Sequence, residues 1–186
     1  MNEKQFNTIK YALISLVIIL ELGHLSWEYF NGGVLSHHLL NRADLPSISN
    51  WWGLIIIPLL AWFTTTRVKK RIILPHHDLA ISAKIKNGIL IGFTGMLIIS
   101  IIQSLAFTFG YQHITMYLAL GLLITGLFIP IYRAECILGN VLGAVFIFGP
   151  VIPFIGILVM APVSAFSHLC LKPLILRLVK GKASST

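Results

Sequence analysis

Runs of apolar residues separated by short polar and basic stretches make up most of this sequence. A hydrocarbon core about 30 Å thick is crossed by about 20 helical residues, so runs of this length predict transmembrane helices. We predict six of them, at residues 11–30, 50–66, 87–110, 114–132, 134–148 and 151–171. The pattern is typical of an all-α integral membrane protein, with a six-helix transmembrane bundle forming one domain over residues 1–186.

The last apolar stretch, residues 134–171, is too long for one crossing and contains helix-breaking residues. Gly149, Pro150 and Pro153 lie near its middle, and a glycine followed by prolines ends helices. We therefore predict that the fifth and sixth helices form a Gly/Pro-broken hairpin. A re-entrant pair is the alternative, since irregular backbone is tolerated in a membrane where protein or water covers it.

The basic residues test the number of crossings. With six helices and a cytoplasmic N-terminus, one side of the membrane holds thirteen of them and the other holds only Arg42. The thirteen are Lys4, Lys10, Arg67, Lys69, Lys70, Arg71, Lys84, Lys86, Arg133, Lys172, Arg177, Lys180 and Lys182. Five crossings would move the last four outside. The positive-inside rule therefore favours six helices with both termini in the cytoplasm.

The amino-acid composition is typical of a membrane protein and indicates which class of partner it binds. The chain is 56% hydrophobic and 11% charged, too little charge to cover a soluble domain. Its net charge is +8, and the basic residues flank the apolar segments. There they suit anionic lipid headgroups better than nucleic acid. We expect a multi-pass protein of a bacterial cytoplasmic (inner) membrane, with membrane lipids as its partners. The pairs Gly88/Gly92 and Gly139/Gly143 favour close helix packing within one bundle over an oligomer interface.

The first predicted helix carries three titratable side chains on one face. Glu21, His24 and Glu28 are spaced by three and four residues, which places them on one side of an α-helix. A carboxylate at membrane depth is costly unless it is neutral, paired or bound to a cation. We expect this face to point into the bundle, and we take the three as candidate catalytic residues.

Further polar residues fall in the same half of the membrane or on its surface. The predicted orientation places there three more histidines (His37, His38 and His113) and a group of neutral polar residues (Asn50, Ser100, Gln103 and Ser104). The spacing Glu-x-x-His presents two metal ligands from one helix. A divalent metal held by His24, Glu28, His37, His38 and His113 is one hypothesis, with zinc, iron or copper suited by ligand type. A metal-free proton relay and a structural hydrogen-bond network are the alternatives.

A second group lies near the opposite side of the membrane. It contains Glu135, Asn140 and His168, together with a loop that carries His76, His77 and Asp78. Arg133 is close enough in sequence to pair with Glu135, and Ser164 lies one turn before His168. We take Glu135, Asn140 and His168 as a secondary inner-side site.

The stretch His24-Leu25-Ser26-Trp27-Glu28 resembles the His-x-x-x-Glu helix of sterol-isomerase-like membrane proteins. The resemblance covers five residues with two fixed positions and does not assign a family. It implies protonation of a double bond in a buried lipid by a carboxylate–histidine pair.

Three functions fit these patterns. The first is a metal-dependent or acid/base enzyme acting on a lipid-soluble substrate, with Glu21 or Glu28 as acid or base and His24 as ligand or proton partner. The second is a small proton-coupled transporter, which requires a polar path to the inner side. The third is a non-catalytic accessory subunit. We favour the first.

Overall fold

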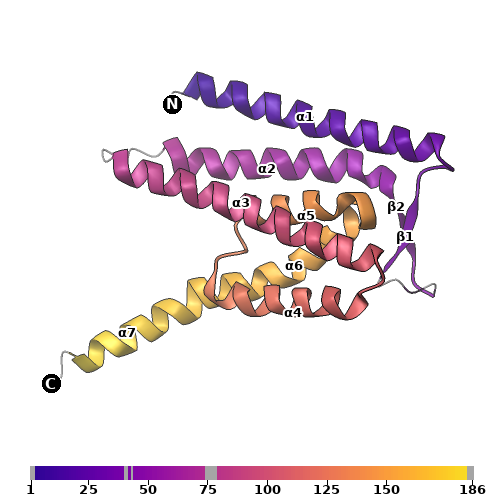
Figure 1. Ribbon diagram of the computed structural model, residues 1–186. Coiled ribbons are helices and arrows are strands. Elements are labelled where there is room, and N and C mark those ends of the chain that lie inside the picture. Colours follow the sequence, from indigo (N-terminus) through magenta and orange to yellow (C-terminus); the bar gives the residue numbers. More distant parts are fainter. Residues whose placement is uncertain (1–2, 40–41, 43, 74–78, 184–186) are drawn as a thin grey trace.

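The structure, a computed structural model, describes residues 3–39, 42, 44–73 and 79–183 and consists almost entirely of helices (Figure 1). The elements in chain order are α1 (Glu3–Phe30), β1 (Ser36–His38), β2 (Ser47–Ser49), the 3-10 turn η2 (Asn50–Trp52), α2 (Gly53–Ile73), α3 (Leu79–Thr108), α4 (Gln112–Phe128), α5 (Ala134–Phe148), α6 (Val151–Phe166), the π-helical segment η3 (Ser167–Leu171) and α7 (Lys172–Ala183). Each predicted segment contains a helix.

Four helical stretches of the described chain are long and apolar enough to cross a membrane. They are Glu3–Phe30, Asn50–Ile72, Ala83–Thr108 and Val151–Arg177. Helices α4 and α5 are also apolar but have only 17 and 15 residues. At 1.5 Å per residue these lengths are about 26 and 22 Å, short of a hydrocarbon core of about 30 Å.

Helices α1, α2 and α3 extend further than predicted. All three extensions lie at the same end of the bundle, because α2 runs antiparallel to α1 and α3 (Figure 1). Helix α1 begins at Glu3 rather than Tyr11, α2 continues to Ile73, and α3 begins at Leu79 rather than at residue 87. The added turns carry lysines and arginines. Helices can continue through the membrane interface, where such side chains reach the headgroups, so the apolar run alone underestimates their length.

The predicted break between the fifth and sixth helices is present and is short. Gly149 has a φ of +65° and ends α5, a conformation that L side chains rarely adopt. Pro150 then precedes α6. Pro153 lies in the first turn of α6, where its missing N–H leaves no hydrogen bond unmade. The prolines within helices, Pro58 in α2 and Pro162 in α6, do not end them.

Helix α5 lies at the centre of the bundle. Its residues from Ala134 to Val141 are all buried, and it packs against α2, α3 and α6. A Cβ on Gly139 would collide with the carbonyl of Phe93 in α3, and one on Gly143 would meet the carbonyl of Leu97. The Gly139/Gly143 pair therefore serves packing within the chain.

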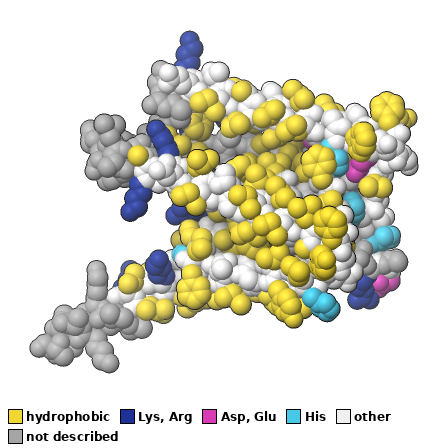
Figure 2. Space-filling model, viewed as in Figure 1, with side chains coloured by type: hydrophobic (Ala, Val, Ile, Leu, Met, Phe, Trp, Pro, Cys, Tyr) yellow, Lys and Arg dark blue, Asp and Glu magenta, His cyan; other side chains and the backbone are white. Residues whose placement is uncertain are grey.

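The two ends of the bundle differ in charge. At one end, which we call the hairpin end, the antiparallel strands β1 and β2 pair in the register His37 to Ile48 (Figure 1). The other, which we call the basic end, holds both chain termini in Figure 1. Figure 2 shows Lys and Arg side chains gathered at the basic end and histidines at the hairpin end. No element was predicted between residues 31 and 49, so these strands were not anticipated from the sequence.

Candidate functional site

Glu21, His24 and Glu28 form a buried cluster on α1 near the hairpin end. Their exposed fractions are 3%, 6% and 7%. Nδ1 of His24 lies 3.8 Å from Oε2 of Glu21, and Nε2 lies 3.3 Å from Oε1 of Glu28. The helical spacing therefore places one imidazole between two carboxylates, and this face points into the bundle as the sequence predicted.

Glu28 connects three elements of the hairpin end. Asn50 donates from Nδ2 to Oε1 of Glu28 at 2.6 Å, and the backbone N–H of Leu35 donates to Oε2 at 3.2 Å. The N–H of Asn50 in turn donates to the carbonyl of Leu35 at 3.0 Å. The carboxylate thus ties α1 to the segment before β1 and to η2, and both of its oxygens accept hydrogen bonds.

Glu21 lies against the beginning of α2. A Cβ on Gly53, the first residue of α2, would collide with Oε1 of Glu21, and the ring of Pro150 lies on the same side of Gly53. Oε1 has no hydrogen-bond partner among the described residues. The carboxylate is therefore accommodated because Gly53 has no side chain.

The His24 ring is held by an aromatic contact. Its centroid lies 4.5 Å from that of Phe146 in α5, at an interplanar angle of 52°. Nδ1 of His24 makes no hydrogen bond within the described chain, and Oε2 of Glu21 lies 3.8 Å from it. Phe146 thus fixes the orientation of an imidazole whose two nitrogens face the two carboxylates.

His37 adds a second histidine to the cluster from outside α1. Its Cδ2 would lie 3.3 Å from a Cβ on Gly149, and that Cβ would also collide with Oδ1 of Asn50. Nε2 of His37 is buried and has no hydrogen-bond partner in the part of the chain that the structure describes. Burial lowers the pKa of His37, and the negative charge of Glu28 partly offsets this effect. The imidazole is therefore favoured in its neutral form.

His37 also borders a cavity of about 390 Å³ between α3, α4, α5 and α6. The cavity combines aromatic walls, including Phe107 and Phe148, with the polar side chains of Gln103 and Asn140. Sites for small molecules usually have volumes of about 300–1,000 Å³, with apolar walls and a few polar groups. The cavity meets the titratable cluster at His37.

The predicted metal ligands do not converge. His38 is exposed at the cavity rim, with Nδ1 2.7 Å from the carbonyl of Leu45, and His113 is exposed on α4. Among the described residues, no group of three His, Cys, Asp or Glu side chains could hold a metal ion. Both His37 and His38 line the cavity, but adjacent strand residues point to opposite faces, and of the two only His37 has a buried, unpartnered ring nitrogen within the described chain. The structure therefore gives no support to a zinc, iron or copper site.

The predicted polar lining is divided between two places. Asn50 belongs to the Glu28 cluster, whereas Ser100 and Gln103 border the cavity. Ser100 donates to the carbonyl of Asn140 at 2.7 Å, and Ser104 to that of Gly143 at 3.4 Å. Gln103 donates to the carbonyl of Thr115 in α4 at 3.3 Å. These side chains hold α3 against α5 and α4 rather than surrounding Glu21.

The predicted inner-side residues do not form one site either. Glu135 pairs with Arg71 of α2 at 2.6 Å, not with Arg133 as expected. Asn140 instead contacts Ser100, by donation from Nδ2 at 3.2 Å. His168 lies in η3, with its ring 6.0 Å from that of Tyr132. Ser164, the expected partner of His168, donates to the carbonyl of Ile129 at 3.1 Å. His76, His77 and Asp78 lie outside the described residues.

The sequence analysis missed the contributions of Gly53, Phe146 and the Gly149–Pro150 turn to the site. The turn was recognised as a helix break, but its approach to Asn50 and His37 depends on tertiary packing. Apart from its position after two tryptophans, nothing in the sequence indicated that Gly53 contacts Glu21. Phe146 was indistinguishable from other apolar residues of its helix.

Comparisons with known proteins add no family to this description. A scan against protein-family models found no match, and searches of curated proteins and of solved structures found none either. The function of the site must therefore be argued from its geometry.

Proposed function

We propose that this chain is an integral membrane enzyme that moves a proton to or from a small lipid-soluble substrate, with His37 as the group that contacts the substrate. The observation that carries the proposal is the buried, unpartnered Nε2 of His37 within the described chain, together with the cavity that the residue lines. Imidazole is the side chain best suited to exchange protons near neutral pH. We also propose that the basic end lies in the cytoplasm of a bacterium, with the cavity in the outer half of the membrane.

The α1 cluster provides the electrostatic support for this step. When His37 takes a proton, the negative charge of Glu28 stabilises the imidazolium. His24 lies 3.3 Å from Glu28 and 3.8 Å from Glu21, so the two carboxylates and the imidazole can redistribute charge along one helix face. In this scheme Glu28, His24 and Glu21 are positioning residues.

The cavity fits an amphipathic substrate better than an ion path. Its deeper walls include Leu122, Ile157 and Met160, and the first two are buried members of the hydrophobic core. A transporter would need polar groups or water to continue towards the basic end. The polar residues Ser100 and Asn140 also line the cavity, but they hydrogen-bond to each other, which favours the enzyme over the proton-coupled transporter.

The test compares a histidine that lines the cavity with one that does not. We expect His37→Gln to abolish a change in membrane lipid composition that the wild-type protein produces when it is expressed in a bacterial host. His113→Gln is the control, because His113 is exposed on α4 and does not line the cavity. Loss of a general acid or base lowers the rate about 100-fold or more. The measurement is untargeted mass spectrometry of extracted lipids, normalised to the amount of folded protein.

A second candidate, a non-catalytic subunit, is favoured by one observation. Both oxygens of Glu28 accept hydrogen bonds that tie α1 to the hairpin end, as expected of a group that only fixes helix register. This alternative predicts identical lipid profiles for the wild type, His37→Gln and His113→Gln, together with reduced thermal stability of Glu28→Gln. That combination of results would replace the enzymatic proposal.

A further inference from the structure

A second cavity lies on the other side of α5 from the candidate site. It is a groove of about 470 Å³ between α1, α2, α3 and α5, and it shares no lining residue with the cavity at His37. Glu135, Leu138 and Leu142 of α5 face the groove, whereas Asn140 and Ala144 face the other cavity. Helix α5 is thus the wall between two separate spaces.

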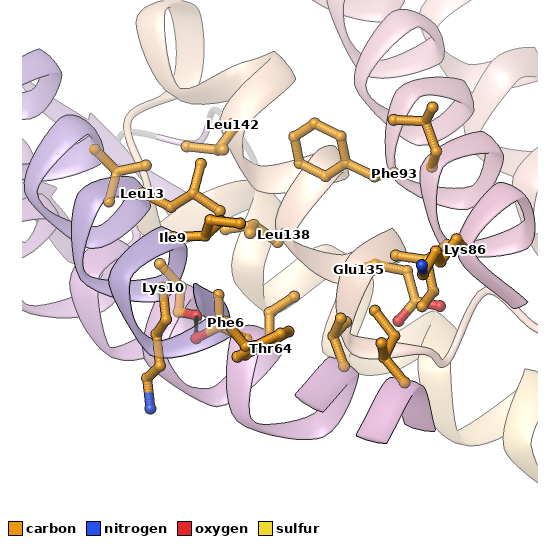
Figure 3. A pocket seen from close by; sticks show the side chains of 17 residues that line it. Phe6, Ile9, Lys10, Leu13, Thr64, Lys86, Phe93, Glu135, Leu138 and Leu142 are labelled. Atoms are coloured by element: carbon orange, nitrogen blue, oxygen red, sulfur yellow. Dashed lines mark hydrogen bonds between the residues drawn. The ribbon is translucent and has the colours of Figure 1, made fainter. Parts of the chain in front are cut away.

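The walls of the groove are aliphatic and aromatic. Figure 3 shows Ile9 and Leu13 of α1, Leu138 and Leu142 of α5, and Phe93 of α3 around it. Protein interiors are close-packed, and an unfilled space of this size forfeits contacts on all its sides. A flexible chain of CH₂ groups would restore these contacts.

The length of the groove matches one acyl chain. Along α1 it extends from Phe6 to Val17, and along α2 from Ala61 to Ile72. Eleven helical steps of 1.5 Å give about 16 Å, close to half of a hydrocarbon core of about 30 Å. The groove therefore has the depth of a single leaflet.

Three charged residues line the groove, and two of them, Lys86 and Glu135, lie at one of its ends. The third, Lys10, is buried, with Nζ 3.1 Å from Oγ1 of Thr66 and over the Trp62 ring. Lys86 is exposed, lines the groove and has no ion-pair partner among the residues described. Glu135 also lines it, but its carboxylate is paired with Arg71 at 2.6 Å. Figure 2 shows further Lys and Arg side chains at this basic end. The charge at the mouth of the groove thus complements an anionic headgroup.

We propose that the groove is a binding site for one anionic phospholipid, with an acyl chain along α1 and α5 and its phosphate at Lys86. The lipid would occupy the leaflet of the basic end. It would fill the space that separates α1 from α5 and so complete the packing of α1. The site is independent of the acid–base chemistry proposed for the opposite side of α5.

Native mass spectrometry of the purified protein tests this site. The protein in detergent is mixed with equal amounts of dioleoyl phosphatidylglycerol and dioleoyl phosphatidylcholine, and the retained lipid is counted. We expect one retained phosphatidylglycerol, favoured about fivefold over phosphatidylcholine, the effect of one lysine near an anionic headgroup. Equal retention of the two lipids would overturn the proposal.

Matched variants locate the lipid. Leu13→Trp places a large ring in the groove and should remove the bound lipid, whereas Leu16→Trp, on an exposed part of the same helix, should retain it. Lys86→Gln should remove the preference for phosphatidylglycerol, and Lys84→Gln should keep it. If Leu13→Trp is not monodisperse, Leu90→Trp fills the groove from α3. Lipid retained by a folded groove-filling variant at the wild-type level would refute the site.

Discussion

Single side chains at the hairpin end hold segments that few other contacts join. Glu28 accepts hydrogen bonds from Asn50 and from the backbone of Leu35, and it is 7% exposed. Hydrogen bonds to a charged group are stronger than neutral ones, and leaving a buried partner unsatisfied costs more than the bond itself contributes. The stability of this end therefore depends on the charge of one carboxylate.

We expect Glu28→Gln to lower the free energy of unfolding by about 1.5–3 kcal/mol. The amide has one acceptor oxygen, so its NH₂ group must face either the Asn50 donor or the Leu35 N–H. Thermal unfolding in detergent measures the effect. Asp44→Asn is the control, because the Arg42–Asp44 pair is exposed, and its melting temperature should stay near that of the wild type.

His37 should protonate only at a pH below the ordinary histidine value of 6.5, because burial lowers its pKa. The unfolded chain then binds a proton before the folded protein does. The free energy of unfolding should consequently fall as the pH decreases below about 6.5. The ¹⁵N chemical shifts of the His37 ring, assigned with His37→Gln, report the titration. A midpoint above 6.5 would contradict the expectation.

Glycines allow pairs of helices to pack closely, and hydrogen bonds then join the two helices. Helix α5 approaches α3 closely because Gly139 and Gly143 have no Cβ there. Ser100 and Ser104 of α3 then reach carbonyl groups of α5. Small residues with hydroxyl hydrogen bonds are a common way to join helices in membranes.

Gly139→Ala and Gly143→Ala should each destabilise the bundle by about 1–3 kcal/mol, the usual cost of overpacking. Gly88→Ala is the control, because a Cβ there meets nothing within 4 Å; an alanine in an open helical position is favoured by up to about 1 kcal/mol. The melting temperatures of the three variants show whether alanine is tolerated at each position. Equal behaviour at Gly139 and Gly88 would show that the α3–α5 contact is looser than described.

The periodicity of the sequence predicted which face of α1 is buried but not what surrounds it. The spacing of Glu21, His24 and Glu28 follows from helix geometry alone. The choice between His37 and His38 required knowing that residues 36–38 form a strand, and three residues carry too short a pattern for that. The pairing of Glu135 with Arg71 joins residues 64 positions apart, so sequence proximity wrongly favoured Arg133.

For the whole molecule, the distribution of charge and the lengths of the helices are those expected of a protein that spans a membrane. Figure 1 shows the two termini at the same end, and Figure 2 shows the lysines and arginines concentrated there. Four stretches of the described chain are long and apolar enough to cross a membrane. Helices α4 and α5 were predicted as full spans from their apolar composition, which does not reveal that neighbouring helices cover α5.

Cysteine labelling tests the proposed orientation. In intact bacterial cells that carry the Cys170→Ser background, a membrane-impermeant maleimide should label Asp44→Cys without permeabilisation. It should label Lys4→Cys and Lys84→Cys only after the inner membrane is opened, because positive charge is retained in the cytoplasm. Cys136 is buried and needs no replacement. Labelling of Lys4→Cys in intact cells would reverse the orientation.

The central position of α5 has a consequence for biosynthesis. The ribosome makes α1–α4 before this segment, so the groups that receive its polar side chains, Arg71 for Glu135 and Ser100 for Asn140, already exist when it emerges. A segment of 15 residues with a glutamate and an asparagine is poorly suited to partition into lipid by itself. We expect it to leave the translocation machinery together with α6, as a pair, into a space that the first four helices have prepared. Insertion of α5 would then be a late step whose failure exposes the incomplete chain to proteolysis.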